Sequence, residues 1–254
     1  MPRAASRPLP RRSCQTLDPS VEEFEYTLAA FKSSLCSDID AYALRAKNKV
    51  AHKWKATWRS LLLRETVAWR LQDLLEQSCR LHSISGILGA RILLRSAFET
   101  LAVLVYLNQS MRRVVAGEEE FHAFSETTTK LIVGSRDGTT SHQSVNILTV
   151  LGRADRRYPG LESWYAALSE SAHPNYEGML LGYSKSDPES RVTSFENCWS
   201  SRYGHNHIDA LRACYFVFEG EYNEEWPAAF EELERWIEQH DEELEASKGG
   251  AGGI

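Results

Sequence analysis

The stretch from Ile87 to Leu107 constrains the fold most, because its residues are apolar on almost every side of a helix. A helix of this kind has to be surrounded by other helices, since any exposed face would leave apolar side chains in water. Apolar residues also recur at helical spacing through most of the chain, and no long stretch alternates as a half-buried strand does. The sequence therefore predicts an all-α fold, an antiparallel bundle of about seven to eight helices.

Local start and stop signals define the ends of several predicted helices. Asp18 and Pro19 predict the start of a first helix that runs to about Lys49. Pro174 predicts that a later helix ends at His173, because the residue before a proline avoids helical geometry. The polar segment Ser184–Ser201 is expected to form either a second long loop or one short strand at Arg191–Phe195. The other helices are expected near residues 54–82, 85–106, 111–133, 145–157, 161–172, 208–222 and 226–240.

The length of 254 residues allows one large domain or two small ones. We expect a disordered basic tail at 1–16, a single all-α domain at 17–246 and a flexible tail at 247–254. The glycine- and hydroxyl-rich segment 134–143 is typical of a loop, and it marks the place where the domain could be subdivided.

The composition is that of an ordinary globular protein, with 43% hydrophobic and 25% charged residues. Five cysteines occur without a Cys-x-x-Cys pair or an apolar leader, which predicts free thiols and a cytoplasmic location. Charged residues interrupt the most apolar predicted helix, so we expect no membrane span.

No cofactor or metal site is expected. Glu119-x-x-His122 lacks the second motif and the further glutamates of a di-iron bundle. Cys198, His205 and His207 lack a fourth ligand and the spacing of a structural zinc site.

Charge is unevenly distributed along the chain. Ala41 to Arg64 holds seven basic residues and no acidic residue, whereas Glu219 to Glu245 holds twelve acidic residues and one arginine. Tryptophans lie among the basic residues, so this stretch can follow an RNA backbone, with Lys53, Lys55 and Arg59 as binding residues. The alternative is a solvated helix face, or docking of the basic segment on the acidic one within the fold or across a dimer.

Three charges form one stripe along the apolar helix, at Arg91, Arg95 and Glu99. Burying charges costs several kcal/mol unless they are paired and hydrogen-bonded, so partners must meet them inside the bundle. One hypothesis is structural: Arg95 pairs with Glu99 at i,i+4, and other helices satisfy the rest. The other is a polar pocket in which an anionic group binds the guanidinium groups.

A second constellation places Tyr165, Ser169 and His173 on one helical face, followed by Pro174 and Asn175. A histidine at a helix end can exchange protons near neutral pH. The structural alternative is a hydrogen-bonded or capping histidine. An active site would require His173 and the Arg95/Glu99 stripe to share one cavity.

A third constellation, Arg202-Tyr-Gly-His-Asn-His207, begins a late helix and has an Arg-x4-His spacing. Helical bundles with this pattern resemble the HEPN superfamily. That resemblance implies metal-independent RNA cleavage, in which His207 assists attack by a 2′-hydroxyl and Arg202 stabilises the developing phosphorane charge. It also implies a homodimer whose protomers build the cleft together.

A broader resemblance spans roughly residues 84–183. Arg95, Phe98 and Glu99, together with Ser169, His173 and Asn175, are similar to motifs of uncharacterised bacterial helical proteins, some of them considered distant HEPN relatives. This resemblance implies a pocket and supplies no activity.

Two hypotheses for function follow. The first is a HEPN-like protein that acts on RNA, in particular a metal-independent endoribonuclease in a toxin or phage-defence role. Its candidate catalytic residues are His173, Arg95, Glu99, Arg202 and His207, and its candidate binding residues are Arg91, Ser169, Asn175, Lys53, Lys55 and Arg59. The alternative is a non-catalytic helical module that binds a small anionic ligand or a protein partner.

Overall fold

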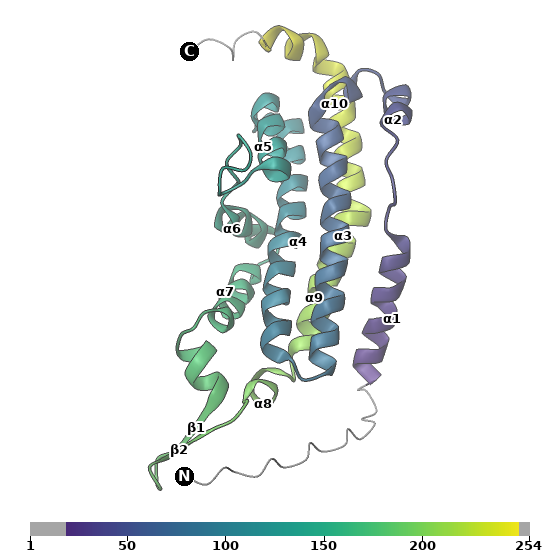
Figure 1. Cartoon of the computed structure of the whole chain (residues 1–254). Coiled ribbons are helices and arrows are strands. Elements are labelled where there is room, and N and C mark those ends of the chain that lie inside the picture. The colour runs from purple at the N-terminus through teal and green to yellow at the C-terminus, as the bar shows by residue number, and fades with distance from the viewer. Residues whose placement is uncertain (1–18, 249–254) are drawn as a thin grey trace.

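The computed structural model describes residues 19–248, and in this part ten α-helices form an antiparallel bundle (Figure 1). The predicted all-α fold is confirmed. The helices are α1 (Pro19–Ser34), α2 (Ala41–Lys47), α3 (Lys55–Ser83), α4 (Ile87–Val115), α5 (Phe121–Val133), α6 (Ile147–Arg157), α7 (Leu161–Ala172), α8 (Trp199–Tyr203), α9 (His207–Gly220) and α10 (Trp226–Ser247).

Helix α4 is the centre of the bundle. It contacts α3, α5, α6, α7, α9 and α10, and Figure 1 shows it between α3 on one side and α5, α6 and α7 on the other. Leu94, Leu101, Leu104 and Met111 are completely buried on this helix. Each such side chain contributes about 1.5–3 kcal/mol by leaving water. The long apolar stretch in the sequence thus encodes the central helix, as predicted.

The structure divides the first two predicted helical regions differently. The first helix ends at Ser34 instead of continuing to Lys49, and α2 is a separate element. Asp40 causes this restart, because its carboxylate accepts hydrogen bonds from the backbone N–H groups of Tyr42 and Ala43. The prediction of one continuous helix was therefore wrong.

A second boundary was also misplaced. Helix α4 runs on to Val115, and α5 begins only at Phe121, whereas the sequence predicted a break near 106–111. Gly117 lies in the linker with φ of 73°, a conformation that favours glycine. The position of Gly117 therefore indicates where the chain leaves the helix, whereas the end of the most apolar stretch does not.

Three short irregular helical elements lie between the α-helices of the described residues. Two π-helical segments, η2 (Tyr176–Leu181) and η3 (Glu221–Glu225), follow α7 and α9, and a short 3-10 turn, η1 (Ala51–Lys53), precedes α3. Strand β2 (Val192–Phe195) confirms the predicted strand and pairs with β1 (Ser184–Asp187) in an antiparallel hairpin. Helix α7 ends before an extended His173, as Pro174 predicted.

Most residues of the two predicted tails lie outside the described part of the chain, whereas the predicted subdivision at 134–143 lies within it. The predicted tail 1–16 and the capping residue Asp18 lie outside them, as do residues 249–254 of the predicted C-terminal tail. Buried residues before and after the loop at 134–146 belong to one hydrophobic core cluster. Among the described residues, no helix has the combination of length and apolarity needed to cross a bilayer.

Candidate functional site

Arg91 in the charged stripe of α4 binds the facing elements and is mostly buried. Its Nε donates to Ser171 Oγ at 2.7 Å and its Nη2 to the Ala167 carbonyl at 3.2 Å. The guanidinium also lies 4.4 Å from the ring centroid of Tyr203, and Glu177 is 3.7 Å away. Burial lowers the pKa of Arg91, and the Glu177 carboxylate opposes that shift. Arg91 therefore connects α4 to α7, η2 and α8.

Arg95 and Glu99 form the predicted i,i+4 pair, with 3.3 Å between Arg95 Nη2 and Glu99 Oε1. Arg95 Nη2 also donates to the Tyr165 hydroxyl at 2.7 Å. The Nε of Arg95 is buried without a hydrogen-bond partner among the described residues. The pair thus retains a free donor and, on Glu99, a free carboxylate oxygen.

An open pocket of about 860 Å³ lies over this pair, and we name it the polar pocket. Helix α6 begins at its rim, where Asn146 accepts a hydrogen bond from the backbone N–H of Leu148. The free N–H groups and the dipole of a helix N-terminus favour an anion. The lining residues are Arg95, Glu99, Arg136, Gln143, Ser144, Asn146, Ile147, Leu148 and Tyr165.

The structure separates His173 from the polar pocket. His173 is exposed at the end of α7 and is absent from the lining. It follows the lining residue Tyr165 by eight residues, which is about 12 Å along a helix. Ser169 carries a buried hydroxyl without a partner in the described part of the chain. Asn175 binds Glu170 at 2.5 Å and caps η2 through the N–H of Gly178.

His207 is buried, with only 2% of its surface exposed. Its Nε2 lies 2.9 Å from Ser78 Oγ, and its ring stacks on that of His82. Burial, together with electrostatic interactions with His82 and Arg91, lowers the pKa of His207 to about 3. Arg202, by contrast, is exposed on α8. A proton-transfer role near neutral pH, expected from the Arg-x4-His spacing, therefore has no support in the geometry of His207.

The basic segment docks partly on the acidic helix α10. Lys53 pairs with Asp241 at 2.6 Å and with Glu245 at 2.8 Å, and His52 lies 2.7 Å from Glu234. The hydrogen bonds that Lys53 donates to Asp241 and Glu245 raise the pKa of Lys53. This geometry matches the docking alternative for Lys53.

The other two candidate RNA-binding residues, Arg59 and Lys55, do not contact the acidic helix α10. Arg59 donates through Nη1 to the Ser125 carbonyl at 3.3 Å, and burial lowers its pKa. Lys55 is exposed and makes no hydrogen bond or ion pair with a described residue. It lines an open groove of about 380 Å³, which we name the basic groove. The groove is lined by Ala41, Tyr42, Leu44, Arg45, His52, Lys53, Trp54, Lys55 and Trp58.

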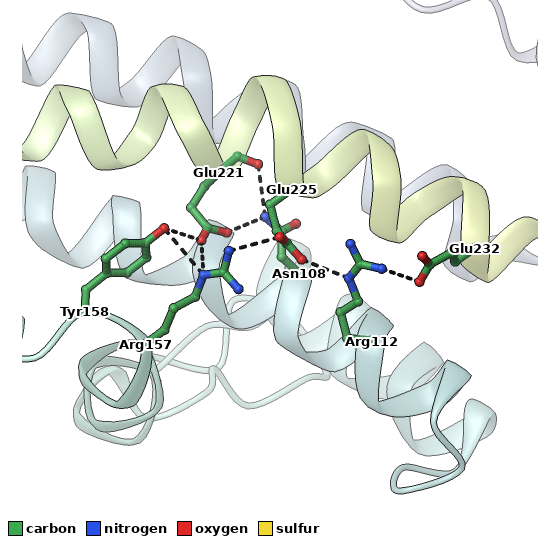
Figure 2. Close-up of polar contacts among 7 residues, drawn as sticks. All are labelled: Asn108, Arg112, Arg157, Tyr158, Glu221, Glu225 and Glu232. Carbon is green, nitrogen blue, oxygen red and sulfur yellow. Dashed lines mark hydrogen bonds and ion pairs between the residues drawn. The ribbon is translucent and has the colours of Figure 1, made fainter.

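Sequence analysis missed a buried network around the π-helical segment η3 (Figure 2). Glu221 is completely buried and lies 2.5 Å from Arg157 Nε. It also accepts hydrogen bonds from the Tyr158 hydroxyl and from Asn108, each at 2.7 Å. The one sequence feature that points to this network is the pair of acidic residues Glu221 and Glu225, which lie four residues apart just after an apolar helix.

Sequence analysis also missed Arg136, Gln143, Ser144 and Asn146 of the polar pocket. All four lie in or beside the loop that precedes α6, where no periodicity indicates which side chains face inward. Among residues 19–248, no cluster of three or more His, Cys, Asp or Glu side chains is arranged to hold a metal ion.

The site therefore brings Arg95, Glu99 and Tyr165 together with four polar residues from the segment before α6, and leaves His173, Arg202 and His207 outside. Chemically, this arrangement can bind and orient an anion, because it offers guanidinium groups and a helix N-terminus. Comparisons with protein-family models, with curated proteins and with solved structures find no match to this chain.

Proposed function

We propose that this protein is a non-catalytic helical module that binds a small, polar, monoanionic ligand in the polar pocket. The observation that carries the proposal is the meeting of Arg95, Arg136 and the N-terminus of α6 in one open pocket. The volume of about 860 Å³ lies within the range of small-molecule sites.

The charges of the pocket select the ligand. Arg95 is matched by Glu99, whereas Arg136 is exposed and forms no ion pair with a described residue. One positive charge is therefore left, which suits a single carboxylate, since a guanidinium binds a carboxylate through two parallel hydrogen bonds. The free oxygen of Glu99 can accept a hydrogen bond from a hydroxyl or amino group of the same ligand.

RNA cleavage is less well supported by the same geometry. Acid–base catalysis needs a group that titrates near the working pH within hydrogen-bond reach of the substrate. His207 is buried with a pKa near 3, and His173 lies outside the polar pocket. Cleavage by these histidines, and the HEPN relationship that implies it, stay predictions.

Calorimetric titration with lactate, glycerate and malate tests the proposal. We expect lactate or glycerate to bind, and Arg136→Gln to weaken binding at least tenfold, since a charge-assisted hydrogen bond contributes about 1.5–3 kcal/mol. Glu99→Gln removes the only acidic side chain of the lining and should shift the preference from monoanionic lactate towards dianionic malate. Arg235→Gln, an exposed arginine of α10, is the matched control.

Two results would contradict the proposal. One is the absence of binding by the unmodified protein, and the other is equal weakening by Arg136→Gln and Arg235→Gln, which would indicate unspecific attraction by surface charge.

A second candidate function is binding of single-stranded RNA along the basic groove. Arg45 and Lys55 make no ion pair with described residues there, and Tyr42 is 89% exposed. An exposed aromatic ring beside unpaired cations suits base stacking and phosphate contacts. We expect the double variant Arg45→Gln/Lys55→Gln to weaken binding of a single-stranded RNA in fluorescence anisotropy and to reduce its salt dependence. Unchanged affinity and salt dependence would remove this candidate.

The cysteines support a cytoplasmic location. Cys36, Cys79, Cys198 and Cys214 are free thiols, and the last is completely buried. Burial raises the pKa of the Cys79 thiol to about 11, so it stays protonated and unreactive. Free thiols of this kind are typical of a reducing compartment.

A further inference from the structure

Five arginines meet at the opposite end of α6 from the polar pocket. Arg112 and Arg113 come from the last turn of α4, and Arg156 and Arg157 from the last turn of α6. With Arg153, Gln109 and Glu225 they line an open pocket of about 280 Å³, which we name the arginine pocket. The eleven residues of α6 separate the two pockets by about 16 Å along the helix axis.

Two of the arginines are held in position by the protein itself. Glu225 accepts from Arg112 Nε at 2.8 Å and from Arg157 Nη2 at 3.0 Å (Figure 2). Burial opposes the ionisation of Glu225, but the hydrogen bonds from both arginines outweigh it and keep its pKa below the usual value. Arg112 also pairs with Glu232, and Arg157 with the buried Glu221. Both guanidinium groups are therefore oriented before any ligand binds, which lowers the entropic cost of binding.

Two other arginines form no ion pair with a described residue, although the charge of Arg153 acts at longer range on the carboxylate of Glu119. The Arg153 guanidinium lies 4.9 Å from the ring centroid of Tyr106 and forms no ion pair with a described residue. Arg156 is exposed and makes neither a hydrogen bond nor an ion pair within residues 19–248. Like charges repel, so gathering these cations beside Arg112 and Arg157 costs free energy that a bound anion would recover.

A structural role explains only part of this cluster. Basic residues in a last turn interact favourably with the helix dipole, which accounts for four of the arginines in electrostatic terms. Arg153 lies one turn earlier in α6, so the helix dipole does not account for its position. Pairing with Glu221, Glu225 and Glu232 accounts for Arg112 and Arg157. Arg113 pairs with Glu118 and Glu119, each at 3.8 Å, so Arg153 and Arg156 are the two arginines of the pocket that no ion pair within residues 19–248 explains.

We propose that the arginine pocket binds the phosphate monoester group of a small molecule. Two unpaired guanidinium groups match a group that carries a charge of about −1.5 to −2 at neutral pH. The planar donors of arginine fit phosphate oxygens in pairs, and the free Nη atoms of Arg112 and Arg157 add further donors. The ligand class and the place both differ from those of the polar pocket.

Calorimetric titration with glycerol 3-phosphate at low ionic strength tests this inference. We expect the unmodified protein to bind one equivalent and the double variant Arg153→Gln/Arg156→Gln to bind at least tenfold more weakly. The matched control Arg235→Gln removes one exposed arginine from α10 and should bind as the unmodified protein does. Arg136→Gln in the polar pocket should also leave this binding unchanged, which separates the two proposals.

Folding is monitored alongside binding. Arg156 touches no described partner, so the single variant Arg156→Gln should keep the thermal unfolding temperature of the unmodified protein while it weakens glycerol 3-phosphate binding. The inference is overturned if the unmodified protein does not bind at millimolar ligand. It is also overturned if Arg156→Gln and the double variant both keep full affinity, or if Arg235→Gln weakens binding as strongly as they do.

Discussion

His207 is held as a neutral imidazole by one hydrogen-bond chain. Ser78 Oγ donates its proton to the Ala90 carbonyl at 2.7 Å, so it can only accept from His207 Nε2 at 2.9 Å. The ring therefore carries its proton on Nε2, and its Nδ1 is buried without a partner among the described residues. Protonation would place a charge at a buried site, which is why the pKa of His207 falls to about 3.

This histidine makes stability depend on pH. The pKa of His207 is about 6.5 in the unfolded chain and about 3 in the folded chain. The unfolded state thus binds more protons in that window, so the free energy of unfolding falls as the pH drops below 6.5, by at most about 1.4 kcal/mol per pH unit from this residue. We expect His207→Gln, which keeps a donor towards Ser78, to reduce that slope in urea unfolding at pH 7, 6 and 5.

The exposed neighbour His205 provides the control. His205→Gln should keep the slope of the unmodified protein. If His207→Gln and His205→Gln show the same slope, protonation of His207 does not govern acid stability.

At the scale of elements, η3 and its carboxylates join α9 and α10 to α4 and α6. Glu221 is fully buried, and Asn108 of α4 and Arg157 of α6 bind its two carboxylate oxygens (Figure 2). We expect Glu221→Gln to lower the free energy of unfolding by about 1.5–3 kcal/mol, because Asn108, Tyr158 and Arg157 then lose hydrogen bonds to a buried carboxylate. Chemical denaturation followed by circular dichroism measures this loss. The exposed Glu219→Gln should cost far less, and equal stability of the two variants would refute a structural role for Glu221.

The sequence predicted the elements well where an apolar face repeats. The buried residues of α4 lie on nearly all sides of the helix, and burial decides its position without help from other signals. The predictions failed where a single side chain or glycine overrides that pattern, as with Asp40 before α2 and Gly117 after α4. One side chain gives a weaker signal in the sequence than a repeating apolar face does, so these helix ends were not predicted although single residues determine them.

The candidate site was less predictable than the fold. The spacing of Arg95 and Glu99 predicts their pair, because i,i+4 neighbours share one helix face. It does not reveal Arg136, which reaches the pocket from a loop. Nor does the Arg-x4-His spacing reveal that Ser78, more than a hundred residues away in sequence, buries His207 against α3.

For the whole molecule, charge complementarity helps to close the bundle. The acidic helix α10 pairs with the basic segment through Lys53 and with α4 through Arg112. These contacts are partly exposed, and exposed pairs contribute little each, about 0–1 kcal/mol. The basic and acidic stretches of the chain thus partly neutralise each other. Cations without an ion pair to a described residue lie in the basic groove, the arginine pocket and the polar pocket.

One core connects the two parts of the chain on either side of the loop at 134–146. Phe124 before the loop and Leu151 after it are completely buried in the same cluster, and α4 contacts both α5 and α6. A protease site inserted between Asp137 and Gly138, where the backbone is exposed, can be cut without removing any core residue. We expect the two fragments to co-elute in size-exclusion chromatography and to separate only in denaturant. Separate elution under native conditions would instead show two independent domains. Fragments that share one core stay together because their separation would expose apolar surface to water, at a free-energy cost of about 25 cal/mol per Å².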